Sequence, residues 1–202
     1  MKRALLRELY YITAIQNVAS MMQRGILCHN LSPVRKPVLI SNAEVQQRRA
    51  HKTTPSGQPL HDYANLYFTA RNPMMYVSRD KHLNLCVLRI NPKVIENADE
   101  AFVTDGNAAS KDTAIWQATE GIEKINASQV FAEYWTHTDE KIEQERKRIK
   151  CAEVLIYKLV PPRFVKGAFV SCQQSRNVLT VQVPTLPVTI KPDLFFLDGA
   201  RA

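Results

Sequence analysis

Glycine is scarce in this chain, with six among 202 residues, and none of the six stands in a phosphate-binding loop. The sequence contains no G-x-G-x-x-G and no G-x-x-x-x-G-K-[ST], the glycine patterns that cradle phosphates in many nucleotide-binding proteins. It also contains no G-x-S-x-G, the turn that presents the nucleophile of many serine hydrolases. A nucleotide bound by this chain would therefore contact irregular loops and side chains.

Metal ligands and long apolar runs are equally lacking. The four cysteines form no C-x-x-C pair, and with five scattered histidines they give no zinc spacing, so we expect no metal. No apolar run approaches the roughly 20 residues that cross a bilayer, and no apolar segment follows the basic N-terminus. We expect a cytoplasmic protein without a signal peptide or a membrane, where cysteines stay reduced.

Positive charge is in excess, with a net charge of +8 and a pI of about 9.4. Such an excess favours a polyanionic partner, nucleic acid first. The alternative for each basic cluster is an ordinary solvated surface. The clusters lie at 35–36, 48–52, 79–82 and 146–150.

The pattern of apolar residues predicts a single domain over 1–202, of α+β class, built around a mixed or split antiparallel sheet with flanking helices. Apolar and β-branched runs predict strands over 9–13, 66–69, 83–90, 101–104, 153–159 and 165–171. Helical spacing and charge predict helices over 14–24, 42–50, 113–125 and 139–150. Segments 178–183 and 188–190 fit either a strand or a short helix.

A lone carboxylate, Glu153, begins the apolar run 154–157 and directly follows the basic segment 146–150. It should therefore stand on a strand whose other residues are buried, where a charge needs a partner or a chemical role. The alternative is a glutamate at a strand edge that makes only a salt bridge.

Five segments, in this order and spacing, resemble the DarT family from about residue 10 to about residue 171. The segments are His29-Asn30-x-Ser32-Pro33, Gln47-Arg48-Arg49, His61-Asp62-Tyr63, Tyr67-Phe68-x-x-Arg71-Asn72-Pro73-Met74-x-Tyr76 and Ala152-Glu153-Val154-Leu155-Ile156-Tyr157-Lys158. Any one of them alone would be a weak signal.

The resemblance implies a DNA ADP-ribosyltransferase, the toxin of a DarT–DarG toxin–antitoxin system, with a role in phage defence. Such proteins hold NAD in the cleft of a split sheet and, without a metal, attach ADP-ribose to a base of single-stranded DNA. Thymidine is the favoured base and guanosine the alternative. The implied partners are single-stranded DNA and a cognate DarG-like macrodomain antitoxin, with the transferase itself a monomer.

The resemblance also implies roles for individual residues. Arg49 and Glu153 match the catalytic pair, 33–51 matches the element that closes over NAD, and 107–153 contains the substrate-recognising loop. The NAD-contacting candidates are Tyr11, Ile12, Thr13, Ser20, Cys28 and Arg49. The candidates for binding DNA are Tyr67, Arg71, Met74, Tyr76, Asn107, Ser110 and Arg148. The chain departs from many family members at Tyr11 and Ala14, where histidines are common, and at Ser20, where glycine is common.

The chemistry needs these residue types. Breaking the bond between nicotinamide and ribose develops positive charge on the ribose, which an anionic carboxylate stabilises. Arginine is a poor base, since its pKa exceeds about 12, so stabilising a deprotonated base or contacting phosphate is its easier role. A ring nitrogen used in pairing is exposed in single strands, where aromatic side chains can stack on bases. Further aromatic candidates are Trp116, Tyr134 and Trp135, with core packing as the alternative, and His61 with Asp62 fits a structural hydrogen-bond pair.

Two other functions stay open from the sequence. One is a transferase of the same fold that modifies RNA or protein, which a net charge of +8 does not distinguish from one acting on DNA. The other is a nucleic-acid-binding module without catalysis, for which Glu153 would be a liability near phosphates.

Overall fold

The computed structural model describes residues 1, 6–32 and 43–197. The strands are β1 Leu9–Ala14, β2 Ile26–Leu27, β3 Tyr63–Tyr67, β4 Leu85–Ile90, β5 Ala101–Thr104, β6 Ile115–Gln117, β7 Glu153–Tyr157, β8 Leu159–Val160, β9 Val165–Val170 and β10 Val188–Ile190. The α-helices are α1 Val18–Arg24, α2 Ala43–Ala50, α3 Pro73–Val77, α4 Ala118–Lys124, α5 Ala127–Val130, α6 Glu140–Lys150 and α7 Gln173–Gln182. Short 3₁₀ helices connect several of them, and no helix in this described part is long and apolar enough to cross a membrane.

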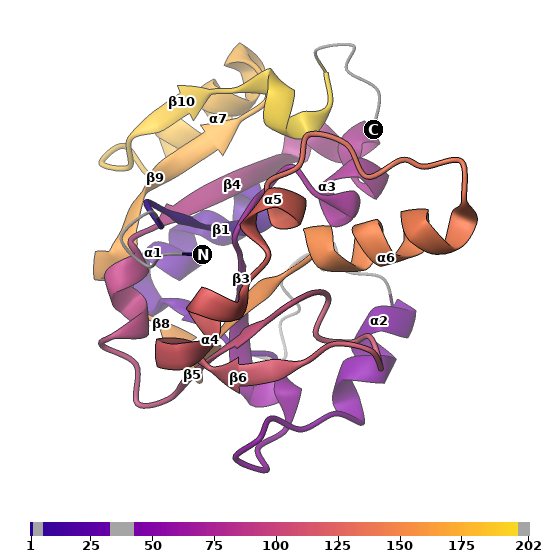
Figure 1. The fold of residues 1–202 in the computed structure, drawn as a ribbon. Coiled ribbons are helices and arrows are strands. Elements are labelled where there is room, and N and C mark those ends of the chain that lie inside the picture. Colours follow the sequence, from indigo (N-terminus) through magenta and orange to yellow (C-terminus); the bar gives the residue numbers. More distant parts are fainter. Residues whose placement is uncertain (2–5, 33–42, 198–202) are drawn as a thin grey trace.

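One large sheet organises the fold, in the order β10-β9-β4-β1-β3-β7-β5-β6 (Figure 1). β10 runs parallel to β9, and the other neighbours are antiparallel. β1 meets β4 over six residue pairs, but it meets β3 over the single pair Tyr10 and Tyr67. The sheet is therefore split into two halves joined at one point, which confirms the predicted α+β fold with a split, mixed sheet.

Apolar side chains from both halves of the sheet form the larger core. It includes Leu88 and Val154 from the sheet and Val18, Ile122 and Leu179 from α1, α4 and α7. Because successive residues of a strand point to opposite faces, a second cluster forms on the other face of the β1 half. That cluster is made of Ile12, Ala70, Met75, Leu85, Val87, Trp135, Phe195 and Phe196.

Helix α6 positions the strand that carries Glu153. Asp139 caps its first turn, with Oδ1 accepting the backbone N–H groups of Lys141 at 2.8 Å and Ile142 at 3.2 Å. Acidic residues occupy the first turn and basic residues the last, which complements the helix dipole. The helix ends at Lys150, and after two intervening residues β7 begins at Glu153. The predicted helix over 139–150 is thereby confirmed.

Three predicted elements differ from the structure. The helix predicted over 113–125 is wrong in its first part, since 115–117 form the edge strand β6, paired to β5. The strand predicted over 153–159 is interrupted, because Lys158 adopts a φ of 61° between β7 and β8. The strand predicted over 66–69 lies instead at Tyr63–Tyr67. Pairing with neighbouring strands decided these limits, and local pattern does not contain that information.

Other segments follow the pattern more closely. The strand predicted over 83–90 begins at Leu85, since 79–84 form a 3₁₀ helix. The two segments left open from the sequence resolve differently. Segment 178–183 belongs largely to helix α7, and 188–190 is strand β10, whose partner β9 supplies the pairing.

Gly121 allows α4 to pack directly on the strands beneath it. A Cβ atom at this position would lie 2.3 Å from Val103 Cγ2 and 2.8 Å from Trp116 Cβ. We expect Gly121→Ala to lower the free energy of unfolding by about 1 to 3 kcal/mol, the usual cost of overpacking, as measured by urea denaturation. Thr119→Ala, on the exposed face of the same helix, is the control, and equal stabilities for the two variants would contradict the packing argument.

Candidate functional site

Arg49 and Glu153 form a buried ion pair, although 104 positions separate them in the sequence. Arg49 Nη1 lies 2.9 Å from Glu153 Oε2 and 3.3 Å from Oε1. The two residues are 5% and 2% exposed. α2 and α6 lie on the same side of the molecule, and this arrangement brings the last turn of α2 to the start of β7 (Figure 1). Glu153, the charged residue that the sequence pattern singled out, is therefore paired with Arg49.

The Glu153 carboxylate has a second donor, the backbone N–H of Ala108, which lies 3.0 Å from Oε1. The backbone N–H of Glu153 donates to Thr104 Oγ1 at 2.9 Å, and that hydroxyl in turn donates to the carbonyl of Gly106 at 2.6 Å. The side chain and the main chain of Glu153 are thus both fixed to the β5 end and the loop after it. A carboxylate held this way is preorganised to stabilise positive charge.

Glu153 stands at the split in the sheet. It lies opposite Tyr67 on β3, and Tyr67 lies opposite Tyr10 on β1, at the one point where the halves join. Burial, and then the nearby Glu153 carboxylate, raise the pKa of Tyr67 well above its ordinary value. The Tyr67 hydroxyl donates to Met74 Sδ at 3.1 Å. Two of the candidates for DNA binding therefore meet beside the ion pair.

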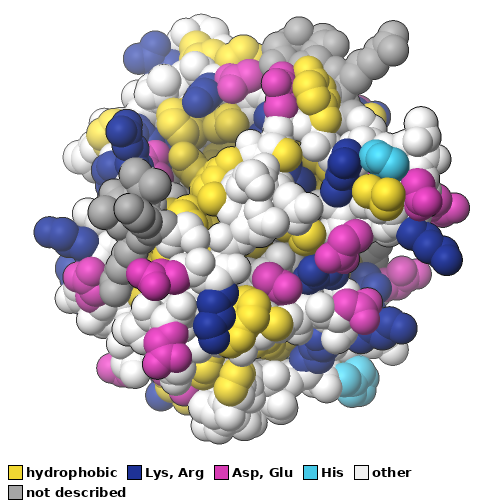
Figure 2. All heavy atoms as spheres, in the orientation of Figure 1, with side chains coloured by type: hydrophobic (Ala, Val, Ile, Leu, Met, Phe, Trp, Pro, Cys, Tyr) yellow, Lys and Arg dark blue, Asp and Glu magenta, His cyan; other side chains and the backbone are white. Residues whose placement is uncertain are grey.

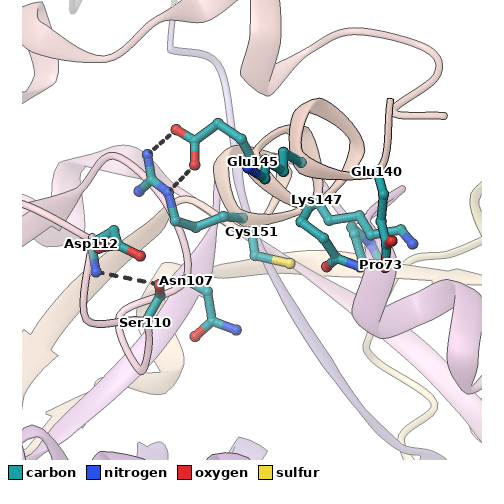
Figure 3. Close-up of a pocket in the computed structure, with 11 residues that line it drawn as sticks. Pro73, Asn107, Ser110, Asp112, Glu140, Glu145, Lys147 and Cys151 are labelled. Carbon is teal, nitrogen blue, oxygen red and sulfur yellow. Dashed lines mark hydrogen bonds and ion pairs between the residues drawn. The ribbon is translucent and has the colours of Figure 1, made fainter. Parts of the chain in front are cut away.

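A groove of about 600 Å³ runs alongside this site. Figure 3 shows Asn107, Ser110 and Asp112 from the β5–β6 loop on one side of it, with α6 on the other. The remaining lining residues are Pro73, Glu140, Lys141, Gln144, Glu145, Lys147, Arg148 and Cys151. Two of its lining residues are close in the chain to the site, since Asn107 adjoins Ala108 and Cys151 precedes Glu153 by two residues.

Arg148 lines the groove but is already engaged with protein groups. Its guanidinium lies 2.9 Å from Asp105 Oδ1 and 2.7 Å from Glu145 Oε1, and it donates to Thr113 Oγ1 at 3.1 Å. The hydrogen bond to Glu145 is the largest cause that raises the pKa of Arg148. Arg148 therefore holds the β5–β6 loop against α6, whatever else it contacts.

Arg71 and Tyr76 belong to an aromatic cluster and do not line the groove. The Arg71 guanidinium lies 4.1 Å from the Phe196 ring centroid, and Nη1 donates to the carbonyl of Asp193. Tyr76 makes edge-on contacts with Trp135 and Phe196. Of the other aromatic candidates, Trp135 is 2% exposed and packs in this cluster. Trp116 packs against the larger core, whereas Tyr134 is 46% exposed.

The NAD-contacting candidates are spread over several environments. On β1, Tyr11 and Thr13 share one face and Ile12 points to the other, into the second core cluster. Burial raises the pKa of Tyr11 to about 12, and the nearby positive charge of Arg49 opposes that shift. Cys28 is buried, and its backbone N–H donates to the Lys158 carbonyl at 2.7 Å.

Two further parts of the expected NAD site differ in how much the structure shows. Ser20 is exposed on α1. Of the segment 33–51 that resembles the element closing over NAD, residues 33–42 lie outside the described residues. The rest of it contains α2, which carries Arg49.

His61 and Asp62 make contacts with the 28–32 turn. The rings of His61 and His29 stack with centroids 4.2 Å apart, and Asn30 Nδ2 donates to Asp62 Oδ1 at 2.7 Å. Burial, with the neighbouring His29, lowers the pKa of His61. The pair therefore orients a neighbouring loop, and the hydrogen bond of Asp62 is made to Asn30.

From the sequence, two lysines of this region stand out only as members of basic clusters, and their hydrogen bonds to the main chain are not predicted. Lys52 Nζ donates to the carbonyl of Ala108 at 3.1 Å and also to that of Ser110. Lys150 is 3% exposed and donates to the carbonyl of Val130 at 3.1 Å, and its burial lowers its pKa to about 8. Both stand in basic runs that are usually solvated, so only the tertiary structure shows them bonded to main-chain carbonyls.

Charges of both signs are interspersed on the face that carries α6, rather than gathered into one basic surface (Figure 2). Within the described ranges, no three His, Cys, Asp or Glu side chains come together in a way that could hold a metal ion. The chemistry available in the described site is therefore that of the buried ion pair and the groove next to it.

Comparisons with known proteins agree on one family. The family model described as "ssDNA thymidine ADP-ribosyltransferase, DarT" matches residues 10–196. A DNA ADP-ribosyl transferase–DNA ADP-ribosyl glycohydrolase fusion protein of Thermosipho africanus (strain H17ap60334) is 33% identical over 203 residues. The match covers 96% of this chain and 50% of the fusion protein, so the chain spans about half the length of that relative.

Solved structures show the same fold. Thermus sp. 2.9 DarT in complex with NAD⁺ superposes with a TM-score of 0.77 at 25% identity, covering 95% of this chain and 98% of that one. Thermus sp. 2.9 DarT in complex with ADP-ribosylated ssDNA gives a TM-score of 0.80 at 24% identity, covering 94% and 96%. The split sheet found here is therefore the sheet of these transferases.

Proposed function

This chain belongs to the DarT family of single-stranded-DNA thymidine ADP-ribosyltransferases, and we propose that it transfers ADP-ribose from NAD to thymidine in single-stranded DNA, releasing nicotinamide. The observation that carries this proposal is the buried ion pair of Arg49 with Glu153 at the split of the sheet. A module that only bound nucleic acid would have no use for a desolvated carboxylate there.

Glu153 is the group we assign to the ribose of NAD. As the bond between C1′ and the nicotinamide nitrogen breaks, positive charge develops on the ribose, and an adjacent carboxylate stabilises it. The N–H of Ala108 and the guanidinium of Arg49 fix that carboxylate from two directions. A group on the first residue of a buried strand is held rigidly, as such a role requires.

Arg49 is the group we assign to the acceptor side. The new bond joins C1′ to a ring nitrogen of the base as the bond to nicotinamide breaks, and the proton of that nitrogen is lost to water. A guanidinium does not accept this proton, but it stabilises the negative charge that the departing proton leaves on the base. Its contact with Glu153 places this positive charge next to the carboxylate that faces the ribose.

The NAD-contacting residues we propose are Tyr11, Thr13, the main chain at Ile12, Ser20, Cys28 and Arg49. Of these, Tyr11 and Thr13 share a face of β1, the strand whose Tyr10 makes the single pairing across the split in the sheet. Support comes from Thermus sp. 2.9 DarT, a protein of this fold that was solved with NAD⁺. No step in this proposal needs a metal.

The groove between α6 and the β5–β6 loop is the place we propose for the DNA strand. Asn107, Ser110 and Pro73 line it. Met74, which follows Pro73 in the chain, accepts from the hydroxyl of Tyr67, and Tyr67 lies opposite Glu153 in the sheet. A target base has to be unpaired to present its ring nitrogen there, which a single strand allows at little cost. Arg71 and Tyr76 do not line the groove, and we assign them to the flanking nucleotides.

The fusion relative supports the proposal that this chain has a partner with glycohydrolase activity. In Thermosipho africanus the transferase is joined to a DNA ADP-ribosyl glycohydrolase, and this chain spans about half of that protein. We propose that the chain acts as the toxin of a toxin–antitoxin pair whose antitoxin, a DarG-like macrodomain, removes the ADP-ribose. Its expression without such a partner should arrest growth.

Mass spectrometry of short oligonucleotides tests the reaction. Single-stranded oligomers with one thymidine, or one guanosine, in an otherwise inert sequence are incubated with NAD and the protein. We expect a mass gain of one ADP-ribose unit on the thymidine oligomer, and fragmentation names the modified base. The same oligomer annealed to its complement should react far more slowly.

Two outcomes would redirect the proposal. Modification of the guanosine oligomer alone would keep the reaction but change the base. No modification of any DNA oligomer, by protein that binds NAD, would contradict the DNA assignment and favour RNA or protein acceptors.

A further inference from the structure

The β5–β6 loop, residues 105–114, is held from two sides by basic residues. On the α6 side, Arg148 contacts Asp105 at 2.9 Å and Thr113 Oγ1 at 3.1 Å. On the α2 side, Lys52 donates from Nζ to the carbonyl of Ala108 at 3.1 Å and to that of Ser110. The position of this loop is therefore fixed relative to both helices that frame the site.

Ala108 links Lys52 to the ion pair. Its carbonyl accepts from Lys52, and its N–H donates to Glu153 Oε1 at 3.0 Å. Arg49, three positions before Lys52, contacts the same carboxylate. Two residues three positions apart thus act on Glu153, Arg49 directly and Lys52 through the loop, so a displacement of the loop would change the donors around the carboxylate.

The same loop forms a wall of the groove. Asn107 and Ser110 lie on either side of Ala108 and line the groove (Figure 3). The carbonyl of Ser110 is one of the two that Lys52 holds. One ammonium group therefore couples the wall of the groove to the residue that orients Glu153.

The surroundings of Lys52 fit a fixed donor rather than a solvated charge. Burial lowers its pKa, the positive charge of Arg49 acts in the same direction, and the carboxylates of Asp112 and Glu153 oppose the shift. Its hydrogen bonds go to carbonyls, which compensate the lost hydration of a partly buried ammonium. An exposed lysine such as Lys93 loses little of its hydration.

We propose that Lys52 is a positioning residue for the transfer step, which fixes the 105–114 loop so that the Ala108 N–H meets Glu153 and the groove stays aligned with that carboxylate. The kinetic effects expected of Lys52 variants rest on the proposed function. The expected effect on the order of the loop rests on the structure alone. Lys52 itself contacts neither reacting group in this account.

Three variants test the role. Lys52→Met keeps the aliphatic stem and removes the donors, Lys52→Arg keeps charge and donors, and Lys93→Met is the control on an exposed lysine far along the chain. For Lys52→Met we expect kcat for oligonucleotide modification to fall about 10- to 100-fold, the usual effect of a small misplacement of reacting groups. The KM for the oligonucleotide should rise, while the Kd for NAD, measured by calorimetry, should change less than about threefold. Lys52→Arg should recover most of the lost rate, and Lys93→Met should match the parent protein.

Hydrogen exchange gives a readout that needs no activity. In Lys52→Met without substrate, peptides covering 107–113 should exchange their amide hydrogens about tenfold faster than in the parent protein, with Lys52→Arg restoring protection. Unchanged exchange would overturn the inference even if the protein modified no DNA. An unchanged transfer rate in Lys52→Met, or a loss in Lys52→Arg equal to that in Lys52→Met, would overturn it as well.

Discussion

Replacing Glu153 by glutamine should reduce the rate of ADP-ribose transfer by about 10² to 10³, on the scale of removing one preorganised electrostatic group. Glutamine has nearly the same shape, and its carbonyl oxygen can still accept from the Ala108 N–H. What disappears is the negative charge beside the ribose. The measurement is the initial rate of oligonucleotide modification by mass spectrometry, with circular dichroism to show that the variant is folded.

Glu120→Gln provides the matched control for this variant. It makes the same chemical change at an exposed residue of α4 that does not line the groove. A Glu153→Gln protein that keeps a rate within about threefold of the parent would show that the charge plays no part in the transfer, on the same scale of effects. The buried ion pair would then be a structural feature only.

Replacing Arg49 by alanine should have two effects, one on the reaction and one on stability. The transfer rate should fall about 10² to 10³, because the acceptor base loses its cationic partner. The free energy of unfolding should also fall, by about 3 to 5 kcal/mol, since Glu153 would be left buried with its charge unpaired. Arg48→Ala, exposed one position earlier on the same helix, should change neither quantity strongly.

A double variant separates the two effects. Combining Arg49→Met with Glu153→Gln removes both buried charges, so much of the stability lost in Arg49→Ala should return, as when a buried ion pair is replaced by neutral groups. The transfer rate should stay low. Recovery of the rate together with the stability would mean that Arg49 serves only to keep the protein folded.

Much of the secondary structure of this protein, and one half of its candidate site, could be predicted from the amino-acid sequence. Apolar runs fixed most of the strands, and the capped, charged segment 139–150 fixed a helix ahead of Glu153, because these features depend on neighbours in the sequence. An isolated carboxylate at the start of a buried strand already demanded a partner, because an unpaired charge is costly away from water. The family resemblance then indicated Arg49 as the other half of the site.

Tertiary structure decided the rest. Strand pairing turned 115–117 into an edge strand although the local spacing favours a helix, because a ladder to β5 was available. Backbone amides and carbonyls are the same at every residue, so the sequence does not show that those of Ala108 and Ser110 would bond to Glu153 and Lys52. These donors and acceptors are identified only once the loop is folded. The sequence by itself singled out Glu153 as a charge that this protein would bury, because the apolar run that follows it is encoded in one short stretch. Which backbone groups meet that charge depends on contacts between segments far apart in the chain, and these only the fold sets.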